Sequence, residues 1–224
     1  MDLILALVGK DIKNLFRVQK SIFSVALFSF IIVVISSFAF RQVGIDSNLS
    51  LQIAPGLLWI VLTYSAVTIL NQTFVFEKEN DALTGLLLTG VNPIHIYIGK
   101  VIVNFIFLFL INIVVLTSVI LLFSLDIGIN YFYLLLVASI VELGFIAIGT
   151  LFSAISVASR AREVLLPILL YPISLPLLIA GVVVCSDILL RNQFDFRDFW
   201  FLLIICYDLI ALTLGIILFE YVLH

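Results

Sequence analysis

Residues 101–125 read VIVNFIFLFLINIVVLTSVILLFSL, an apolar run that contains no charged side chain. Because an α-helix rises about 1.5 Å per residue, a run of this length spans the roughly 30 Å hydrocarbon core of a bilayer. Five more apolar runs of comparable length occur at 21–40, 53–76, 131–158, 164–185 and 199–221. The sequence therefore predicts an all-α, polytopic membrane protein with six transmembrane helices.

The composition indicates that lipid is the solvent for most of the chain. Of the 224 residues, 64% are hydrophobic and 11% are charged, whereas soluble domains average about 45–50% and about 25%. The net charge is −3, and no basic run follows the N-terminal segment, so nucleic-acid binding is excluded. Cys185 and Cys206 have no metal-ligand spacing, and we predict no metal site.

The basic residues predict the orientation of the spans. If the N-terminus lies inside, the inner connections carry Lys10, Lys13, Arg17, Lys20, Lys78, Lys100, Arg160 and Arg162. The outer connections then carry only Arg41, Arg191 and Arg197. Because basic residues concentrate on the cytoplasmic side, both termini are predicted to face the cytoplasm. The outer connections are short, so residues 1–224 form a single membrane domain without an appended catalytic domain.

The segment 1–20 precedes the first predicted span and combines an apolar stripe, which includes Leu5, Val8 and Ile12, with a charged face. This pattern predicts an N-terminal amphipathic helix that lies in the inner membrane interface. The alternative is a basic flank that only fixes the topology of the first span.

The longest inner connection, 77–100, reads EKENDALTGLLLTGVNPIHIYIGK. Acidic residues open it, a short apolar helix follows over 82–88, and Gly90 ends this helix. Asn92 and Pro93 are typical of a helix N-cap and first helical position. The segment therefore predicts a cytoplasmic helix-turn-helix hairpin between the second and third spans.

This hairpin would expose a patch of leucines at the cytoplasmic surface. A patch of this kind is typical of a partner site, and a groove on a cytoplasmic ATPase would cover it. The alternative is a helix that lies back on the membrane. The candidate ATPase-coupling residues are Glu77, Lys78, Glu79, Asp81, Leu83, Leu86, Leu87 and Leu88.

Three stretches carry a resemblance to a known family. They are PGLLW at 55–59, FVFEKENDALTGLLLTGVNPIHIYIGK at 74–100 and GTLFSAISVASRAREVLLPILLYPISLPLLIA at 149–180. In these stretches the chain resembles the haem exporter protein B family, the permease subunit of the cytochrome c maturation ABC transporter. The charged turns at 77–88 and 159–167 make the resemblance specific, because apolar runs alone would match almost any helix bundle.

The resemblance implies an ABC-exporter-type transmembrane domain that pairs with a second copy of itself on two copies of a separate ATPase subunit. The hairpin at 77–100 would be the coupling element. The implied partners are a haem-handling membrane protein and a periplasmic haem chaperone, in a bacterial inner membrane or, alternatively, a mitochondrial one. ATP would bind the partner subunit, since the chain has no GxxxxGK[ST] motif and is not itself predicted to be an enzyme.

Haem is the cargo that the resemblance implies, either crossing through this subunit or leaving on the loaded chaperone. Haem iron is usually held by His, Cys, Met or Tyr. The only histidines are His95, in the predicted hairpin, and His224, and Met1 is the only methionine. We therefore predict no axial ligand pair on the outer half of the pathway and no cofactor bound directly.

Two acidic residues fall inside predicted spans. Glu142 lies in the fourth and Asp208 in the sixth, where a carboxylate is costly unless it is protonated, paired or facing a cavity. Each is a candidate for a conformational or substrate-path residue, and each could instead hydrogen-bond a neighbouring helix. Two further sets of residues in the spans favour helix packing. The first contains the amides Asn71, Asn104 and Asn112, which can join neighbouring helices. The second contains the small residues Gly144, Gly149 and Ala154, which suit close helix approach or a dimer face.

The inner turn between the fourth and fifth spans contains Arg160, Arg162 and Glu163. These residues could anchor the topology alone, or pair with the acidic residues of the hairpin across the cytoplasmic surface. Exposed ion pairs contribute only about 0–1 kcal/mol, so such pairs would steer the hairpin rather than stabilise it.

Two other functions compete with transport. One is a non-transporting scaffold that gathers haem-maturation proteins in the membrane. The other is an intramembrane enzyme that uses Glu142 and Asp208 as an acid-base pair, which the absence of a Ser/His or HExxH arrangement disfavours.

Overall fold

The computed structural model describes residues 8–9, 19–42, 47–75, 92–125, 128, 130–157, 159, 161–191 and 194–223. Its helices are α2 (Gln19–Gln42), α3 (Ser47–Gln72), α6 (Pro93–Leu122), α7 (Asn130–Ser156), α8 (Arg162–Arg191) and α9 (Phe199–Leu223). All six are long and apolar enough to cross a membrane. The described residues form no strand, and the predicted all-α fold with six spans is confirmed.

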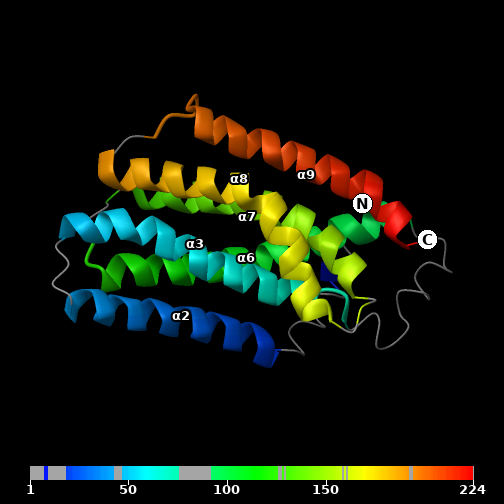
Figure 1. Ribbon diagram of the computed structural model, residues 1–224, viewed down its shortest axis with the longest axis horizontal. Helices are drawn as coiled ribbons and strands as arrows, with labels where there is room; N and C mark the ends of the chain where they lie inside the picture. Colours follow the sequence, from blue (N-terminus) through cyan, green and yellow to red (C-terminus); the bar gives the residue numbers. More distant parts are fainter. Residues whose placement is uncertain are drawn as a thin grey trace.

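The helices lie side by side in a bundle with α2 at one edge and α9 at the other (Figure 1). Helix α7 contacts α3, α6, α8 and α9, whereas α2 packs mainly on α3 and α6. Successive helices run in opposite directions. We call the end of the bundle that holds Gln19, Val75, Asn92 and Val222 the proximal end, and the other the distal end.

Close contacts around α7 depend on two glycines. A Cβ added to Gly144 would clash with the Asp208 carboxylate of α9, and one added to Gly149 would clash with Leu70 of α3. Both glycines therefore let neighbouring helices of the same chain approach α7. The sequence left two roles open for these small residues, close helix approach and a dimer face. For Gly144 and Gly149 the structure shows close approach to helices of the same chain.

Polar side chains join helices within the apolar core. Asn104 of α6 donates from Nδ2 to Thr150 Oγ1 of α7 at 3.3 Å, and Thr73 Oγ1 donates to Asn104 Oδ1 at 3.2 Å. Ser29 of α2 and Ser65 of α3 share a hydrogen bond of 2.8 Å. In lipid, such bonds replace those that water would make. The predicted packing role of Asn104 is thus confirmed.

Three helix boundaries differ most from the prediction. Helix α3 begins at Ser47 rather than at 53, and α8 continues to Arg191 rather than ending at 185. Helix α6 begins at Pro93 rather than at 101, so 93–100 is the first part of the span and not a separate hairpin arm. Charged and polar residues near these ends favour a loop in the sequence, whereas in the structure the helices continue through them.

The start of α6 follows the predicted capping chemistry. Asn92 Oδ1 accepts a hydrogen bond from the Ile94 N–H at 2.9 Å, with Pro93 in the first turn. Lys100 does not end the span, because it is only 7% exposed and its ammonium lies 5.4 Å from the centre of the Phe74 ring. An aromatic face offsets part of the cost of burying this cation.

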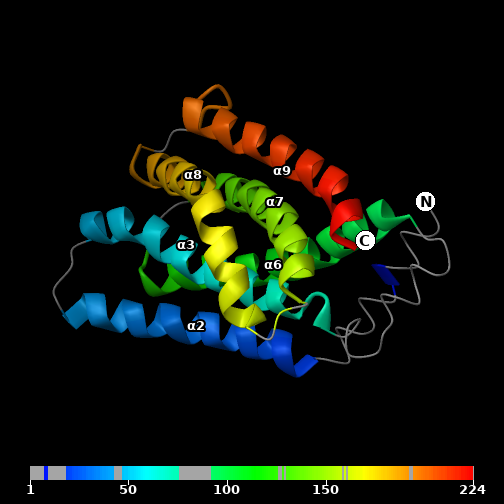
Figure 2. The same cartoon turned by 45° about the vertical axis from the view of Figure 1, so that its right-hand side comes forward.

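Helix α8 contains Pro167, Pro172 and Pro176 and bends along its first half. Figure 2 shows the proximal half of α8 turning away from the line of its distal half. Proline removes a backbone donor and displaces the carbonyl four residues earlier, which explains the bend. Pro55 in α3 is also helical, so all four prolines are accommodated inside spans, as membrane helices allow.

We predict that Gly181→Ala destabilises the bundle by about 1–3 kcal/mol, because overpacking forces neighbours apart. An added Cβ would lie 2.7 Å from Cζ2 and 2.9 Å from Cε2 of Trp59, a residue that is only 4% exposed, so the ring would have to shift. Gly56→Ala in α3 is the matched control, since nothing lies within 4 Å of its added Cβ. Denaturant unfolding in detergent micelles measures both; equal stability of the two variants would contradict the packing described.

Candidate functional site

Three aromatic rings meet at the proximal end of the bundle. Phe74 follows α3, Tyr97 lies in the second turn of α6 and Phe219 lies near the end of α9. The ring centroids of Phe74 and Phe219 are 5.9 Å apart, and those of Tyr97 and Phe219 are 5.3 Å apart. All three side chains are fully buried. Together with Lys100, which lies over Phe74, they form what we call the proximal cluster.

The proximal cluster is tied to further helices. The Tyr97 hydroxyl donates to the Ala147 carbonyl of α7 at 3.0 Å. Gly215 of α9 leaves the space for this hydroxyl, since a Cβ there would clash with it. Phe74 lies shortly before the segment 76–91 and packs on Phe219 of α9, and Tyr97 lies shortly after that segment and bonds to Ala147 of α7.

The predicted ATPase-coupling residues belong to that segment. Glu77, Lys78, Glu79, Asp81, Leu83, Leu86, Leu87 and Leu88 lie outside the described residues, as does Arg160 of the inner turn. The predicted N-terminal interfacial helix is described only at 8–9 and 19–20. These assignments therefore stay predictions.

The rest of the inner turn lies at the proximal end, at the start of α8. Ser159 Oγ accepts a hydrogen bond from the Ala161 N–H at 3.1 Å, which helps to start the helix. Arg162 is half-buried, and Glu163 is exposed in the first turn. An acidic residue in a first turn is favourable because the helix N-terminus carries partial positive charge.

Glu142 lies at the middle of α7, about 18 Å along the helix from Asn130 at 1.5 Å per residue. It is 2% exposed, and neither carboxyl oxygen has a hydrogen-bond partner among the described residues. It lines a small pocket between α3, α6, α7 and α8, which we call the Glu142 pocket. This position is deep in the span rather than at its outer boundary.

Polar groups of the neighbouring helices surround Glu142. Asn112 of α6 is fully buried and interacts with the Glu142 carboxyl group, although the two side chains do not meet hydrogen-bond geometry. Trp59 of α3 lines the same pocket, and within the described part of the chain its Nε1–H has no acceptor. The packing role predicted for the amides is confirmed for Asn104, and for Asn112 it stays a prediction.

Asp208 lies on another side of α7. Its carboxyl group packs against Gly144, and the residue is 5% exposed. Because successive helical residues are about 100° apart, positions 142 and 144 point in nearly opposite directions. The Glu142 pocket accordingly does not include Asp208. The structure does not bring the two acids together, and the acid-base pair of the intramembrane-enzyme hypothesis is not assembled.

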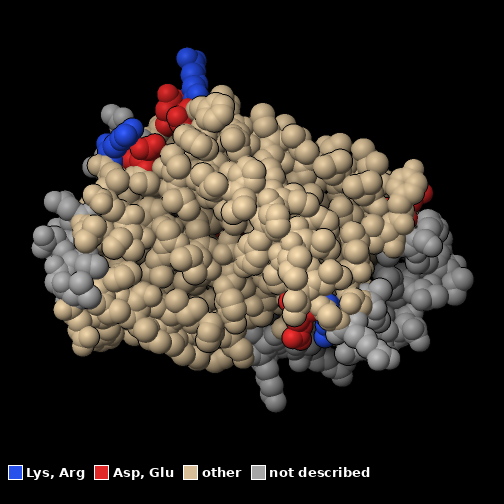
Figure 3. All heavy atoms as spheres, in the orientation of Figure 1, with Lys and Arg blue, Asp and Glu red and all other residues tan. Residues whose placement is uncertain are grey.

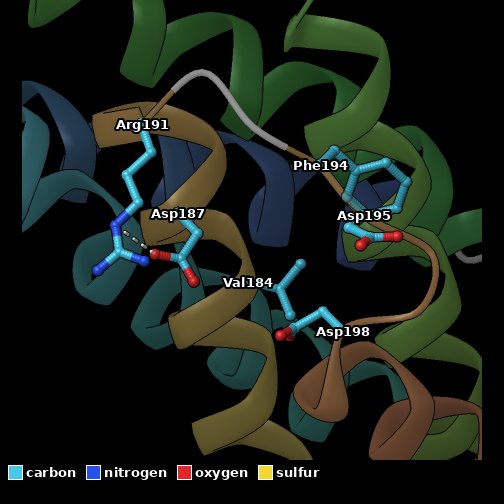
Figure 4. A pocket seen from close by; sticks show the side chains of 6 residues that line it. All are labelled: Val184, Asp187, Arg191, Phe194, Asp195 and Asp198. Carbon is cyan, nitrogen blue, oxygen red and sulfur yellow. Dashed lines mark ion pairs between the residues drawn. The ribbon is translucent and has the colours of Figure 1, made fainter.

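A second pocket, of about 130 Å³, opens at the distal end between α8 and α9 (Figure 4). Asp187 Oδ1 pairs with Arg191 Nε at 3.3 Å, and Asp195 Oδ1 accepts from the Arg197 N–H at 2.9 Å. Asp198 Oδ2 accepts from the Trp200 N–H at 3.0 Å and caps α9. Each carboxylate therefore has a structural role.

Sequence reasoning missed this distal pocket because the fifth span was predicted to end at 185. The i, i+4 spacing of Asp187 and Arg191, typical of helical ion pairs, could have extended the helix and revealed one wall. An aromatic group backs the pocket, since Phe194 lies 5.0 Å from Tyr133 and 5.2 Å from Phe201 between ring centroids.

Charged side chains lie toward the ends of the bundle on the face drawn in Figure 3, with a broad uncharged band between them. Large apolar side chains of α2, α8 and α9 are exposed, for example Ile35 at 62% and Ile168 at 62%. A surface of this kind suits hydrocarbon and not water, as expected for helices that cross a membrane.

Histidine and cysteine, two of the residue types that hold haem iron, are few in the described part of the chain. His95 lies half-buried in the first turn of α6, at the proximal end. Cys185 is buried, Cys206 is exposed, and both thiols are free. The described residues contain no group of three or more His, Cys, Asp or Glu side chains that could hold a metal ion.

Comparison with known proteins agrees with this architecture. No curated protein matches the chain. The family model described as CcmB protein matches residues 2–221, which is nearly the whole sequence and includes all six spans. With its six apolar helices, the chain belongs to the CcmB family and is a membrane permease component of an ABC system for haem export and cytochrome c maturation.

Proposed function

We propose that this permease converts ATP hydrolysis by a separate cytoplasmic ATPase into movement of its helices, with the segment 77–100 as the coupling element. The observation that supports this role is the proximal cluster. Phe74, shortly before the segment, and Tyr97, in the part of the segment that forms the start of α6, pack on the same ring of Phe219. A displacement of the segment would therefore act on several helices at once.

The path of such a displacement follows the described contacts. Helix α6 passes it to α7 through the Tyr97 hydroxyl and the Ala147 carbonyl. Phe219 passes it to α9. Since α7 contacts four other helices, a change at the proximal end would alter how the helices of the bundle pack against each other.

The proximal end faces the cytoplasm in this proposal, with both termini on the same side, in a bacterial inner membrane or alternatively a mitochondrial one. Two copies of the chain would bind two copies of the ATPase, which holds the ATP. A haem-handling membrane protein and a periplasmic haem chaperone complete the assembly. The cycle would then move haem across the membrane or release the haem-loaded chaperone, and no cofactor would bind the permease directly.

Replacing Leu86 and Leu87 by Glu tests the coupling element. We expect the double variant to insert in the membrane but to lose binding of the ATPase subunit and its stimulated ATP hydrolysis, because charge cannot enter an apolar groove. Pull-down and ATPase assays of the reconstituted complex measure both. Arg197→Glu, an exposed charge change at the distal end, is the control and should leave both unchanged.

Unchanged assembly and ATP hydrolysis in the double variant would refute the coupling role. An ATPase-inactive partner separates transport from the scaffold alternative. If cytochrome c maturation continues with an inactive ATPase that still assembles, the chain acts as a scaffold for haem-maturation proteins; we expect maturation to stop.

Phe219→Ala tests transmission through the proximal cluster. Removal of a buried ring typically costs about 3–5 kcal/mol, and Phe219 is fully buried. We expect lower stability and weaker permease-dependent stimulation of ATP hydrolysis, with ATPase binding retained. Tyr221→Ala is the matched control, since this ring is 76% exposed. Full stimulation by a folded Phe219→Ala variant would argue against this route.

A further inference from the structure

The Glu142 pocket contains an acid in an environment that cannot hold its charge. No side chain that lines the described pocket is basic, and its wall is apolar apart from Glu142, Trp59 and Thr63. Transfer of an unpaired carboxylate into such surroundings costs far more than folding can supply, whereas a neutral carboxylic acid is tolerated. In the packed bundle Glu142 therefore carries a proton.

The pocket also has room for one water molecule. Its volume is about 10 Å³, at the lower limit for one water, which needs about 10–15 Å³ by the same measure and two to four polar partners. The partners are present. Trp59, Thr63 and Glu142 line the pocket, and each carries a polar group that a water molecule could bond.

We propose that the Glu142 pocket is a proton-binding site, closed around a neutral acid and one water molecule, and that loss of the proton opens the bundle between α3 and α8. An ionised Glu142 needs several hydrogen-bond donors. The fixed neighbours supply only Trp59 Nε1–H and the Asn112 amide, which interacts with Glu142 from α6. Further donors must be water, which enters when helices separate.

Two other titratable groups on the helices around the pocket face side chains that line it. Cys185 of α8 faces Trp59, and Tyr171 of α8 faces Thr63. Asp208 of α9 lies on the opposite side of α7, against Gly144. None of them lines the described pocket, and none can supply a positive charge to Glu142. A response that belongs to Glu142 can therefore be separated from theirs by substitution.

The inference rests on the geometry of the bundle and does not require the ATPase coupling proposed above. It is tested on the full chain in lipid nanodiscs without a partner, so the two proposals fail independently.

Trp59 is a built-in probe of the pocket. The only other tryptophan is Trp200, whose indole can be replaced by Phe while its backbone N–H still bonds Asp198. In the Trp200→Phe parent, we expect alkaline pH to shift Trp59 fluorescence to longer wavelength and to increase its quenching by acrylamide. Glu142→Gln should abolish both changes, and Glu220→Gln, which removes an exposed carboxyl group, should retain them.

Infrared spectroscopy of the same parent provides the second measurement. The carbonyl band of a protonated carboxylic acid should be present while Trp59 is shielded from water. The band should disappear over the same pH range in which the Trp59 emission shifts. This measurement needs no substitution at Glu142. A parent without the band, or without the fluorescence shift, overturns the proposal. A shift that persists in Glu142→Gln also overturns it and assigns the response to another titratable group, such as Asp208, Cys185 or Tyr171.

Discussion

Hydrocarbon offers no hydrogen-bond partner to a protein, and the disposition of polar groups in this chain follows from that constraint. An unpaired polar group in lipid costs several kcal/mol. Most polar side chains in the core therefore bond to another helix or to their own helix backbone. Ser153 of α7, for example, donates to the Leu70 carbonyl of α3 at 2.5 Å. These bonds hold α7 at the centre of the bundle and set the positions of the helices around it.

Against this background, the core groups left without partners are informative. Glu142, Asn112 and the Trp59 indole are three of these groups and come from three different helices; Trp59 lines the same pocket as Glu142, and Asn112 interacts with Glu142. The proximal cluster contrasts with it, since its rings fill their space and its hydroxyl is bonded. The bundle thus combines a tightly packed end, where the coupling segment attaches, with a less satisfied middle. Force applied at the first would reach the second through α7.

Much of the fold could be predicted from the sequence, because continuous apolar runs of about 20 residues cross a bilayer as helices, whereas strands of a membrane barrel are shorter and alternate apolar and polar residues. The capping pair Asn92 and Pro93 was identifiable from local chemistry alone. Helix ends were less accurate. The charges of Lys100 and Asp187 predict that the spans end near them. In the structure both residues lie within helices, Lys100 over the ring of Phe74 and Asp187 paired with Arg191 four residues later.

The candidate sites were predictable as single residues and not as arrangements. Glu142 and Asp208 were identified because acids are rare in spans, yet only the packing of α7 reveals that they lie on opposite sides of it. Tyr97, Phe219 and Gly215 were not identified, since aromatic residues and glycines are common in membrane helices. Their importance depends on contacts between segments more than 100 positions apart in the sequence, for which a single sequence carries no local signal.

The prolines of α8 give two neighbouring helices different mechanical properties. Each proline lacks the N–H that would bond the carbonyl four residues earlier, so the carbonyls of Glu163, Ile168 and Pro172 lose their helical hydrogen bonds. Helix α7 has no proline and keeps these bonds intact. A helix that lacks backbone hydrogen bonds bends more easily than one that has them all. When force is applied at one membrane face, α8 should therefore bend, while α7 should move as a rigid body.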